Sequence, residues 1–496
     1  MKDDLRRLAA SCLLPGFEGT EPPDWLVRWI ERGVGGVTLF TRNIVSEAQV
    51  ASLNGTLREL NPNLVIAVDE EGGDVTRLEA GAGSSVPGNR ALGEVNDPEL
   101  TEAIAAGIGT KLRAAGVNLN FAPVADVLAG AGSPAIGVRS FGSDPALVAI
   151  HTAAYVRGLQ SQRVMACAKH FPGHGSVTID SHLEPGTLSE DGEELRAHAL
   201  APFRAAIEAG VKAIMTAHLR VRSYGDLPAT LNRGLITDLL RTEMGFQGAV
   251  VTDALEMGAI SRTVGIAQGA VLAMAAGADL ICIAGEIAGP EIVDELVSAL
   301  VEAVEVGRIP IDRMEAAAAR VQTLIDWTKE PVTAELPNRP NAGREAARGA
   351  LRGSGNWRIT GGPIVIELES AGMIAAGAVP WGVGAQLAVI NPGTTVIRLR
   401  STAPVHPLLS EAAGHSLIVA CRDFHLHPWA LGLTEELLTV RPDAMVLEMG
   451  IPALRPIGAT NYLATYGASR VSAEAAIEIL TGSQPIVRRA DSSNLG

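Results

Sequence analysis

The feature that most constrains the fold is a repeated alternation, over residues 1–328, of short apolar runs and longer helical patterns. Runs rich in Val, Ile, Ala and Leu are predicted to be strands at 8–14, 36–40, 64–69, 118–127, 165–170, 213–219, 249–253 and 280–284. Helices are predicted at 23–33, 46–60, 98–115, 145–162, 191–210, 233–243, 264–277, 289–306 and 310–328. Eight parallel β/α units over about 250–330 residues predict a TIM barrel. A doubly wound open sheet is the alternative, but no GxGxxG motif follows the first strand.

The remainder of the chain predicts a second, smaller α/β domain. Residues 329–349 are rich in proline and are expected to be a linker, so that the barrel domain covers 1–328 and the second domain 350–496. Strands are predicted at 364–368, 386–389, 395–399, 416–420 and 444–448, and helices at 427–438 and 472–481. Their order predicts a parallel sheet. His425 and His427 could bind a metal, but a polar loop at a strand end is favoured.

Charge and cysteine usage narrow the possible partners. The formal net charge of −15 argues against a nucleic-acid or anionic-membrane partner. The four cysteines are far apart and lack metal-binding spacing, which fits a reduced compartment. No apolar segment reads as a signal peptide or a membrane span. We therefore expect a cytoplasmic protein that acts on a small molecule, without metal or cofactor; its oligomeric state is left open.

The stretch 169–182 concentrates titratable side chains directly after an apolar run. Polar groups at the end of a buried strand are costly for stability, and such a cluster therefore indicates a site rather than an ordinary solvated loop. A Gly-rich segment at 173–175 suggests that the loop moves. The residues concerned are Lys169, His170, His174, Asp180 and His182.

Other polar residues fall at the ends of neighbouring predicted strands. Asp69 ends the third strand, Arg139 follows the fourth, the sixth carries Thr216 to His218, and Asp253 ends the seventh. Any one of them could be a helix cap or a surface charge. Because catalytic groups of TIM barrels lie at the carboxyl ends of the strands, their recurrence predicts one shared pocket.

Two of these positions suggest a reaction. A carboxylate such as Asp253 can act as a nucleophile or a base. Asp180 lies two residues from His182 and can accept a hydrogen bond that fixes the imidazole tautomer, leaving the other nitrogen to exchange a proton with substrate. Glycoside hydrolysis usually uses two carboxyl groups for these roles, and here the histidine would replace one of them.

These motifs resemble glycoside hydrolase family 3, and within it the β-N-acetylglucosaminidase branch that includes peptidoglycan-recycling enzymes. The matching segments are 35–43, 68–73, 136–142, 169–182 and 251–257, in the family's order. The resemblance implies that Asp253 is the nucleophile, His182 the acid/base and Asp180 its partner. It also implies that the terminal sugar is bound by Asp69, Arg77, Arg139, Lys169 and His170.

The chain also departs from the family pattern. Asp74 stands where many relatives have arginine, and Ala254 to Met257 differ from the commoner sequence after the nucleophile. The role of the second domain is open. The predicted function is a retaining exo-β-N-acetylglucosaminidase acting on muropeptide fragments or chitooligosaccharides. A phosphorylase that uses the same site is the main alternative. A β-glucosidase and a non-catalytic sugar-binding protein rank lower.

Overall fold

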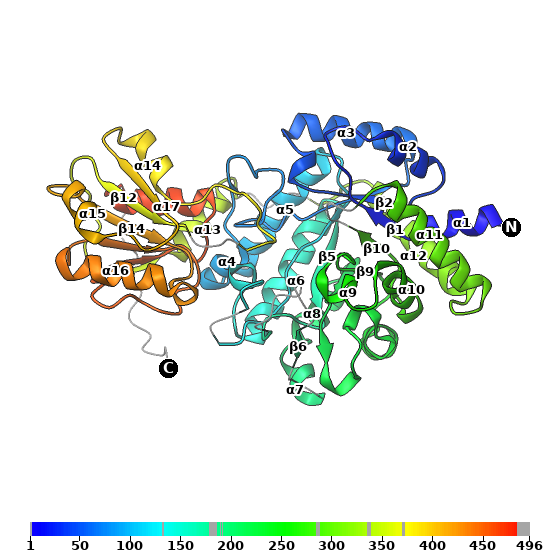
Figure 1. The fold of residues 1–496 in the computed structure, drawn as a ribbon. Helices are drawn as coiled ribbons and strands as arrows, with labels where there is room; N and C mark the ends of the chain where they lie inside the picture. The colour runs from blue at the N-terminus through cyan, green and yellow to red at the C-terminus, as the bar shows by residue number, and fades with distance from the viewer. Residues whose placement is uncertain are drawn as a thin grey trace. The chain divides into compact units, whose positions relative to one another are not determined.

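The computed structural model describes residues 2–130, 133–177, 186–188, 190, 192–283, 288–334, 339–369 and 373–483, and it forms two compact units (Figure 1). The first unit comprises residues 1–71, 98–136 and 140–339, and the second comprises 72–97, 137–139 and 340–496. Two segments of the N-terminal part of the chain therefore pack with the second unit. The predicted division of the chain at 329–349 places both of these segments in the first domain.

Parallel strands form the centre of the first unit. One sheet has the order β2 (Gly36–Leu39), β3 (Val65–Val68), β4 (Leu119–Asn120), β5 (Met165–Phe171), β7 (Ala213–Thr216), β9 (Ala249–Thr252), and β1 (Leu13–Pro15) pairs with β10 (Ile281–Ile283). A parallel bridge between Val251 and Leu280 connects β9 to the segment that enters β10. The predicted class, a TIM-barrel domain followed by a smaller α/β domain, is confirmed.

Helices surround these strands (Figure 1). They are α1 (Lys2–Ala10), α2 (Asp24–Glu31), η1 (Thr41–Asn43), α3 (Glu47–Leu60), α5 (Pro98–Ala114), α6 (Pro145–Ser161), α7 (Gly192–Ala197), α8 (Ala201–Glu208), η3 (Arg222–Tyr224), η4 (Ala229–Leu231), the π-helical η5 (Gly234–Glu243), α9 (Gly258–Ser261), α10 (Ile266–Ala276), α11 (Pro290–Glu305) and α12 (Ile311–Lys329). A short pair, β6 (Thr187–Leu188) and β8 (Arg220–Val221), lies outside the barrel sheet.

Most predicted strands of the barrel are longer than the observed ones, and the differences are largest at 8–14, at 118–127 and at 213–219, which becomes β7. The prediction at 8–14 is wrong over its first residues, because Leu5, Leu8 and Ala9 follow helical spacing and belong to α1. The prediction at 118–127 shrinks to β4, since Pro123 has no N–H for a regular ladder. In the part of the chain that the structure describes, no helix is both long and apolar enough to cross a bilayer.

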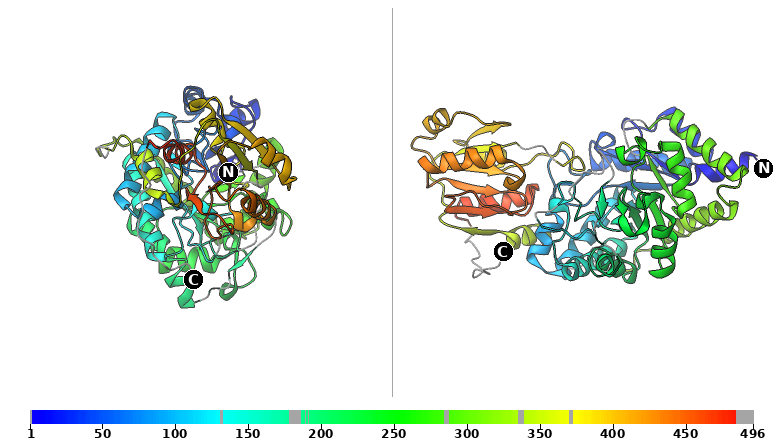
Figure 2. Two further views of the ribbon diagram at one scale, coloured as in Figure 1. Left: turned by 90° about the vertical axis from the view of Figure 1, so that its left-hand side faces the viewer. Right: turned by 60° about the horizontal axis from the view of Figure 1, so that its bottom comes forward.

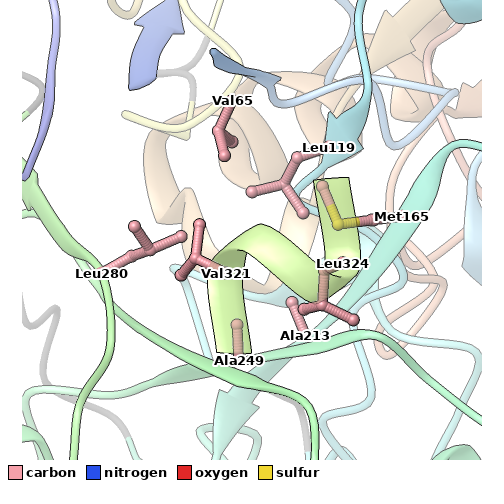
Figure 3. A pocket seen from close by; sticks show the side chains of 8 residues that line it. All are labelled: Val65, Leu119, Met165, Ala213, Ala249, Leu280, Val321 and Leu324. Atoms are coloured by element: carbon pink, nitrogen blue, oxygen red, sulfur yellow. The ribbon is translucent and has the colours of Figure 1, made fainter. Parts of the chain in front are cut away.

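The amino end of the barrel is closed by apolar side chains (Figure 3). A cavity of about 10 Å³ is lined by Val65, Leu119, Met165, Ala213, Ala249, Leu280, Val321 and Leu324. The first five of these include the opening residues of β3, β4, β5, β7 and β9, and α12 supplies Val321 and Leu324. The space is at the lower limit for one water molecule, so this end of the barrel holds no substrate.

A buried carboxylate fixes α12 at this end of the barrel. Asp279 is fully buried and contacts Arg241 of η5, Arg313 at 2.9 Å and Arg320 at 2.7 Å, both of α12. Its Oδ2 also accepts a hydrogen bond of 2.9 Å from the Val250 N–H. The cluster thus connects η5, β9 and α12.

The second unit contains one six-stranded sheet. Its order is β11 (Arg352–Ser354), β16 (Asn461–Ala464), β15 (Met445–Glu448), β14 (Leu417–Cys421), β12 (Ile364–Leu368), β13 (Thr395–Leu399), parallel except for β11. The side chains of α15 (Val405–Glu411) and α16 (Pro428–Val440) pack on one face, and those of α14 (Gly384–Ile390) and α17 (Arg470–Leu480) on the other (Figure 2). Further helices are α4 (Asn89–Val95), η2 (Gly137–Arg139), α13 (Ala342–Ala350) and η6 (Phe424–Leu426).

The parallel sheet of the second unit is confirmed, but one predicted strand is wrong. Residues 386–389 belong to helix α14, in which Leu387 is buried and Val389 is exposed. A one-sided apolar contact suits a helix that covers a sheet better than a strand inside it. The sequence also gave no prediction for β16, which is short and begins at a polar Asn461.

The Asp279 cluster yields a stability prediction. Replacing Asp279 by Ala leaves three guanidinium groups without their shared anion, so the free energy of unfolding should fall by about 3–5 kcal/mol. Denaturant titration of the purified variant measures this loss. The control is Asp294→Ala, because Asp294 pairs with Arg6 at the surface and should contribute only about 0–1 kcal/mol. Equal losses in the two variants would contradict the assigned role.

Candidate active site

A buried lysine links two strands of the barrel at their carboxyl ends. The Lys169 ammonium lies 2.6 Å from Asp69 Oδ1 and 2.7 Å from Glu71 Oε1. Lys169 lies in β5, directly after Ala168, where the regular pairing with β7 is interrupted. The two acids follow β3. The side chains of Lys169 and Glu71 are 2% exposed and that of Asp69 is 20% exposed. Of the three, Asp69 is therefore the group best placed to meet a ligand.

The neighbouring His170 is oriented by the carboxylate of Asp126, which lies in the segment after β4. Its Nδ1 lies 2.7 Å from Asp126 Oδ2, and Asp126 Oδ1 accepts the backbone N–H groups of His170 at 3.2 Å and His174 at 2.7 Å. Burial raises the pKa of Asp126, but the charge and hydrogen bonds of His170 outweigh it and hold that pKa below its usual value. Asp126 therefore stays ionised at neutral pH and fixes the His170 ring.

The loop after β3 is held by hydrogen bonds from the barrel interior. The Asn120 side chain bonds both polar backbone atoms of Glu70, at 2.9 Å and 2.8 Å. The Tyr155 hydroxyl donates to the carbonyls of Glu70 and Glu71, at 3.3 Å and 3.2 Å. Asp69 and Glu71 are thereby presented from a fixed backbone.

Asp253 follows β9 directly and is partly buried. Its N–H donates to the Thr216 carbonyl at 3.2 Å, and its Oδ1 accepts the Ala254 N–H at 2.8 Å. The carboxylate therefore has a defined orientation at the end of its strand. Such a group can attack an electrophilic carbon or accept a proton.

Two buried thiols indicate that Asp69 and Asp253 lie around the same space. Burial raises the pKa of Cys167 in β5, and the charges of Asp69 and Asp253 raise it further. The pKa of Cys282 in β10 is also raised, first by burial and then by charges that include both of these carboxylates. Asp69 follows β3 and Asp253 follows β9 of the same parallel sheet, so both carboxylates lie at the carboxyl end of the barrel.

The described part of the glycine-rich loop is anchored rather than loose. His174 donates its N–H to Asp126, and the Ala129 N–H donates to the Gly175 carbonyl at 3.2 Å. A side chain at Gly175 would collide with the Val127 carbonyl. These contacts fix residues 174 and 175 in the structure; the predicted movement of the loop that carries His182, which lies outside the described residues, stays a prediction.

The predicted residues fall into three groups. Asp69, Lys169, His170 and Asp253 gather at the carboxyl end of the barrel. Asp180 and His182 lie outside the described residues. Arg77 and Arg139 belong to the second unit, where Arg77 Nη2 donates to the Ala375 carbonyl at 2.7 Å and the Asn89 side chain donates to the Arg139 carbonyl at 2.7 Å.

Two residues of the site were not predicted. Asp126 lies near the end of the predicted strand 118–127, where a lone carboxylate inside an apolar run could have marked it. Glu71 was part of the Asp-Glu-Glu motif, but the sequence does not say which of its acids turns inward. Among the described residues, no three His, Cys, Asp or Glu side chains form a cluster that could hold a metal ion.

A closed amino end and a carboxyl end that carries oriented polar side chains are the arrangement of a barrel enzyme. Comparison with known proteins agrees. Residues 24–324 match the glycosyl hydrolase family 3 N-terminal domain. A β-hexosaminidase of Stenotrophomonas maltophilia is 38% identical over 296 residues, which cover 58% of this chain and 86% of the relative. A β-hexosaminidase of Xylella fastidiosa is 39% identical over 297 residues, with the same coverage of 58% and 86%.

A solved structure extends the similarity to both units. The glycoside hydrolase family 3 β-N-acetylglucosaminidase from Paenibacillus sp. FPU-7 superposes with a TM-score of 0.87 at 32% identity, covering 97% of each chain. The chain belongs to glycoside hydrolase family 3, as its motifs predicted.

The Lys169 cluster yields a prediction for this site. Replacing Lys169 by Met leaves two buried carboxylates without their cation and should destabilise the protein by about 3–5 kcal/mol. The double variant Lys169→Met/Glu71→Gln removes one of the stranded charges and should recover part of the loss. Denaturant titration of the single and double variants checks this. A double variant that is less stable than Lys169→Met would contradict the predicted coupling.

Proposed function

We propose that this protein is a retaining exo-β-N-acetylglucosaminidase that releases terminal N-acetylglucosamine from muropeptide fragments or chitooligosaccharides. The observation that carries the proposal is the oriented Asp253 carboxylate, which shares the carboxyl end of the barrel with Asp69, Lys169 and His170. The names of the relatives support the choice of sugar. A cytoplasmic location and a part in peptidoglycan recycling stay predictions from sequence.

The proposed reaction has two displacements. An oxygen of Asp253 forms a bond to the anomeric carbon, while the bond to the leaving oxygen breaks and protonated His182 gives that oxygen its proton. Asp180 accepts a hydrogen bond from His182 and keeps the ring in the tautomer that this requires. Water then attacks the anomeric carbon and releases Asp253, and His182 takes the proton from the water.

The remaining residues bind the terminal sugar in this proposal. Asp69 is the more exposed acid of its cluster and can accept hydrogen bonds from sugar hydroxyls, with Lys169 holding it in place. His170, whose Nδ1 is engaged by Asp126, would use its other ring nitrogen for the sugar. For Arg77 and Arg139, sugar binding stays a prediction from the family resemblance.

A substrate comparison tests the proposal. The purified enzyme should hydrolyse chitobiose and the 4-nitrophenyl glycoside of N-acetylglucosamine, and should leave the corresponding glucoside nearly untouched. Asp253→Ala should lower kcat by at least about 1,000-fold, because no other group then attacks the sugar. A preference for the glucoside, or near-normal turnover by Asp253→Ala, would refute the assignment.

The same assay distinguishes the main alternative. Chitobiose is incubated with and without inorganic phosphate, and the sugar products are separated. Free N-acetylglucosamine at an unchanged rate is expected in both cases. Formation of the sugar 1-phosphate would show that the enzyme is a phosphorylase.

The role of His182 gives a second prediction. His182→Ala removes the proton donor, which contributes about 100- to 10,000-fold when the leaving group is a poor one. Turnover of chitobiose should therefore fall much more than turnover of the 4-nitrophenyl glycoside, whose leaving group needs little protonation. The ratio of the two kcat/KM losses is the measurement. Equal losses on both substrates would count against the general-acid role.

A further inference from the structure

His218 lies just after β7 and has hydrogen-bond partners at both ring nitrogens. Its Nε2 is 2.9 Å from the Ala254 carbonyl oxygen, and its Nδ1 is 2.8 Å from Thr230 Oγ1. Since a carbonyl oxygen only accepts, Nε2 carries a hydrogen. His218 is fully buried, and the proposed reaction gives it no part in substrate contact.

Thr230 holds the imidazole ring in this position. The Thr230 hydroxyl donates to the Ala217 carbonyl at 3.0 Å and accepts from the Thr216 hydroxyl at 3.0 Å. Thr216 and Thr230 are fully buried. A buried network whose members are bonded to one another permits few alternative orientations.

The last hydrogen bond of this network is made to Ala254, the residue that follows Asp253. The Ala254 carbonyl accepts from His218, and the Ala254 N–H donates to Asp253 Oδ1 at 2.8 Å. Both polar backbone atoms of Ala254 are thus engaged: the N–H by the carboxylate, and the carbonyl by the histidine together with the Met257 N–H at 3.1 Å. On the other side, the Asp253 N–H is bound to the Thr216 carbonyl at 3.2 Å, so Thr216 belongs to both halves of the arrangement.

We propose that His218 is a positioning residue that holds the Asp253 carboxylate in its attacking orientation through the backbone of Ala254. This inference rests on the proposed role of Asp253 as the nucleophile. Without the bond from His218, the Ala254 carbonyl keeps only the longer bond from the Met257 N–H, so the Ala254 peptide and the carboxylate bound to it lose part of their restraint. A misplacement of about 1 Å can cost a factor of about 100 in rate. The loss falls on kcat rather than KM, because the residues that bind the sugar are unchanged.

Two substitutions at His218 separate positioning from packing. His218→Gln keeps an N–H donor at the position of Nε2, whereas His218→Met fills similar space without a donor. With the 4-nitrophenyl glycoside, His218→Met should lower kcat about 100-fold with KM within about threefold of wild type. His218→Gln should recover at least tenfold of that loss. Equal kcat for the two variants, or a normal kcat for His218→Met, would overturn the proposal.

Substitutions at Thr230 test the network if His218→Met does not fold. Thr230→Val removes the hydroxyl and should lower kcat by about tenfold, whereas Thr230→Ser keeps it and should stay near wild type. Thr101→Val is the matched control, because Thr101 Oγ1 makes a similar buried bond of 2.8 Å to His151 Nδ1 between α5 and α6. Its kcat should be normal. A Thr230→Val enzyme with the kcat of Thr101→Val would also overturn the proposal.

A covalent probe separates failure of this inference from failure of the proposed function. The enzyme is treated with 5-fluoro-N-acetylglucosaminyl fluoride, which forms a bond from a carboxylate oxygen to the anomeric carbon as fluoride leaves. Peptide mass spectrometry of the wild type should locate the sugar on Asp253, and His218→Met should form the adduct about 100-fold more slowly. An adduct on another residue would refute the proposed function. If His218→Met forms the adduct on Asp253 at the wild-type rate, the positioning role of His218 is refuted and the proposed function stands.

Discussion

The ammonium group of Lys169 between the carboxylates of Asp69 and Glu71 is the interaction on which the barrel site depends. Two acids that follow the same strand would repel each other if no cation lay between them. Lys169 comes from β5, so its two ion pairs also join β5 to the segment after β3 at the carboxyl end of the barrel. Because Lys169 is buried, its removal would leave both carboxylates without a cation in a poorly solvated place.

The residues that close and stabilise the barrel lie at its amino end, and the residues proposed to act in the reaction lie at its carboxyl end. At the amino end, apolar residues and the Asp279 cluster close the barrel and hold α12. At the carboxyl end, polar groups are held in place by hydrogen bonds from side chains or from the backbone. Asp126 orients His170, Asn120 holds the backbone of Glu70, and the Ala254 N–H holds Asp253. Preorganisation of this kind is what a charged transition state requires, since little then has to move during the reaction.

The sequence predicted the barrel because buried parallel strands read as apolar runs, and most of these runs lie where the structure has strands. It was less reliable where an apolar run serves a different purpose. Residues 386–389 cover a sheet as a helix, and Leu8 belongs to α1 rather than to β1. Lys169 and Asp253 were recognisable by their motifs. The contacts of Lys169 with Glu71 and of His170 with Asp126 were not, because they join residues far apart in the chain. Nor does chain order show that residues 72–97 and 137–139 pack with the second unit.

The central claim is that Asp253 forms a covalent bond to the sugar, and the stereochemistry of the product tests it most directly. Proton NMR can follow the anomeric signals of N-acetylglucosamine during the first minutes of hydrolysis of its 4-nitrophenyl β-glycoside, in which every free sugar comes from the reacting anomeric carbon, before that sugar equilibrates. Two displacements at the anomeric carbon predict that the β-anomer appears first. If the α-anomer appears first, water attacks the substrate directly and Asp253 is not the nucleophile.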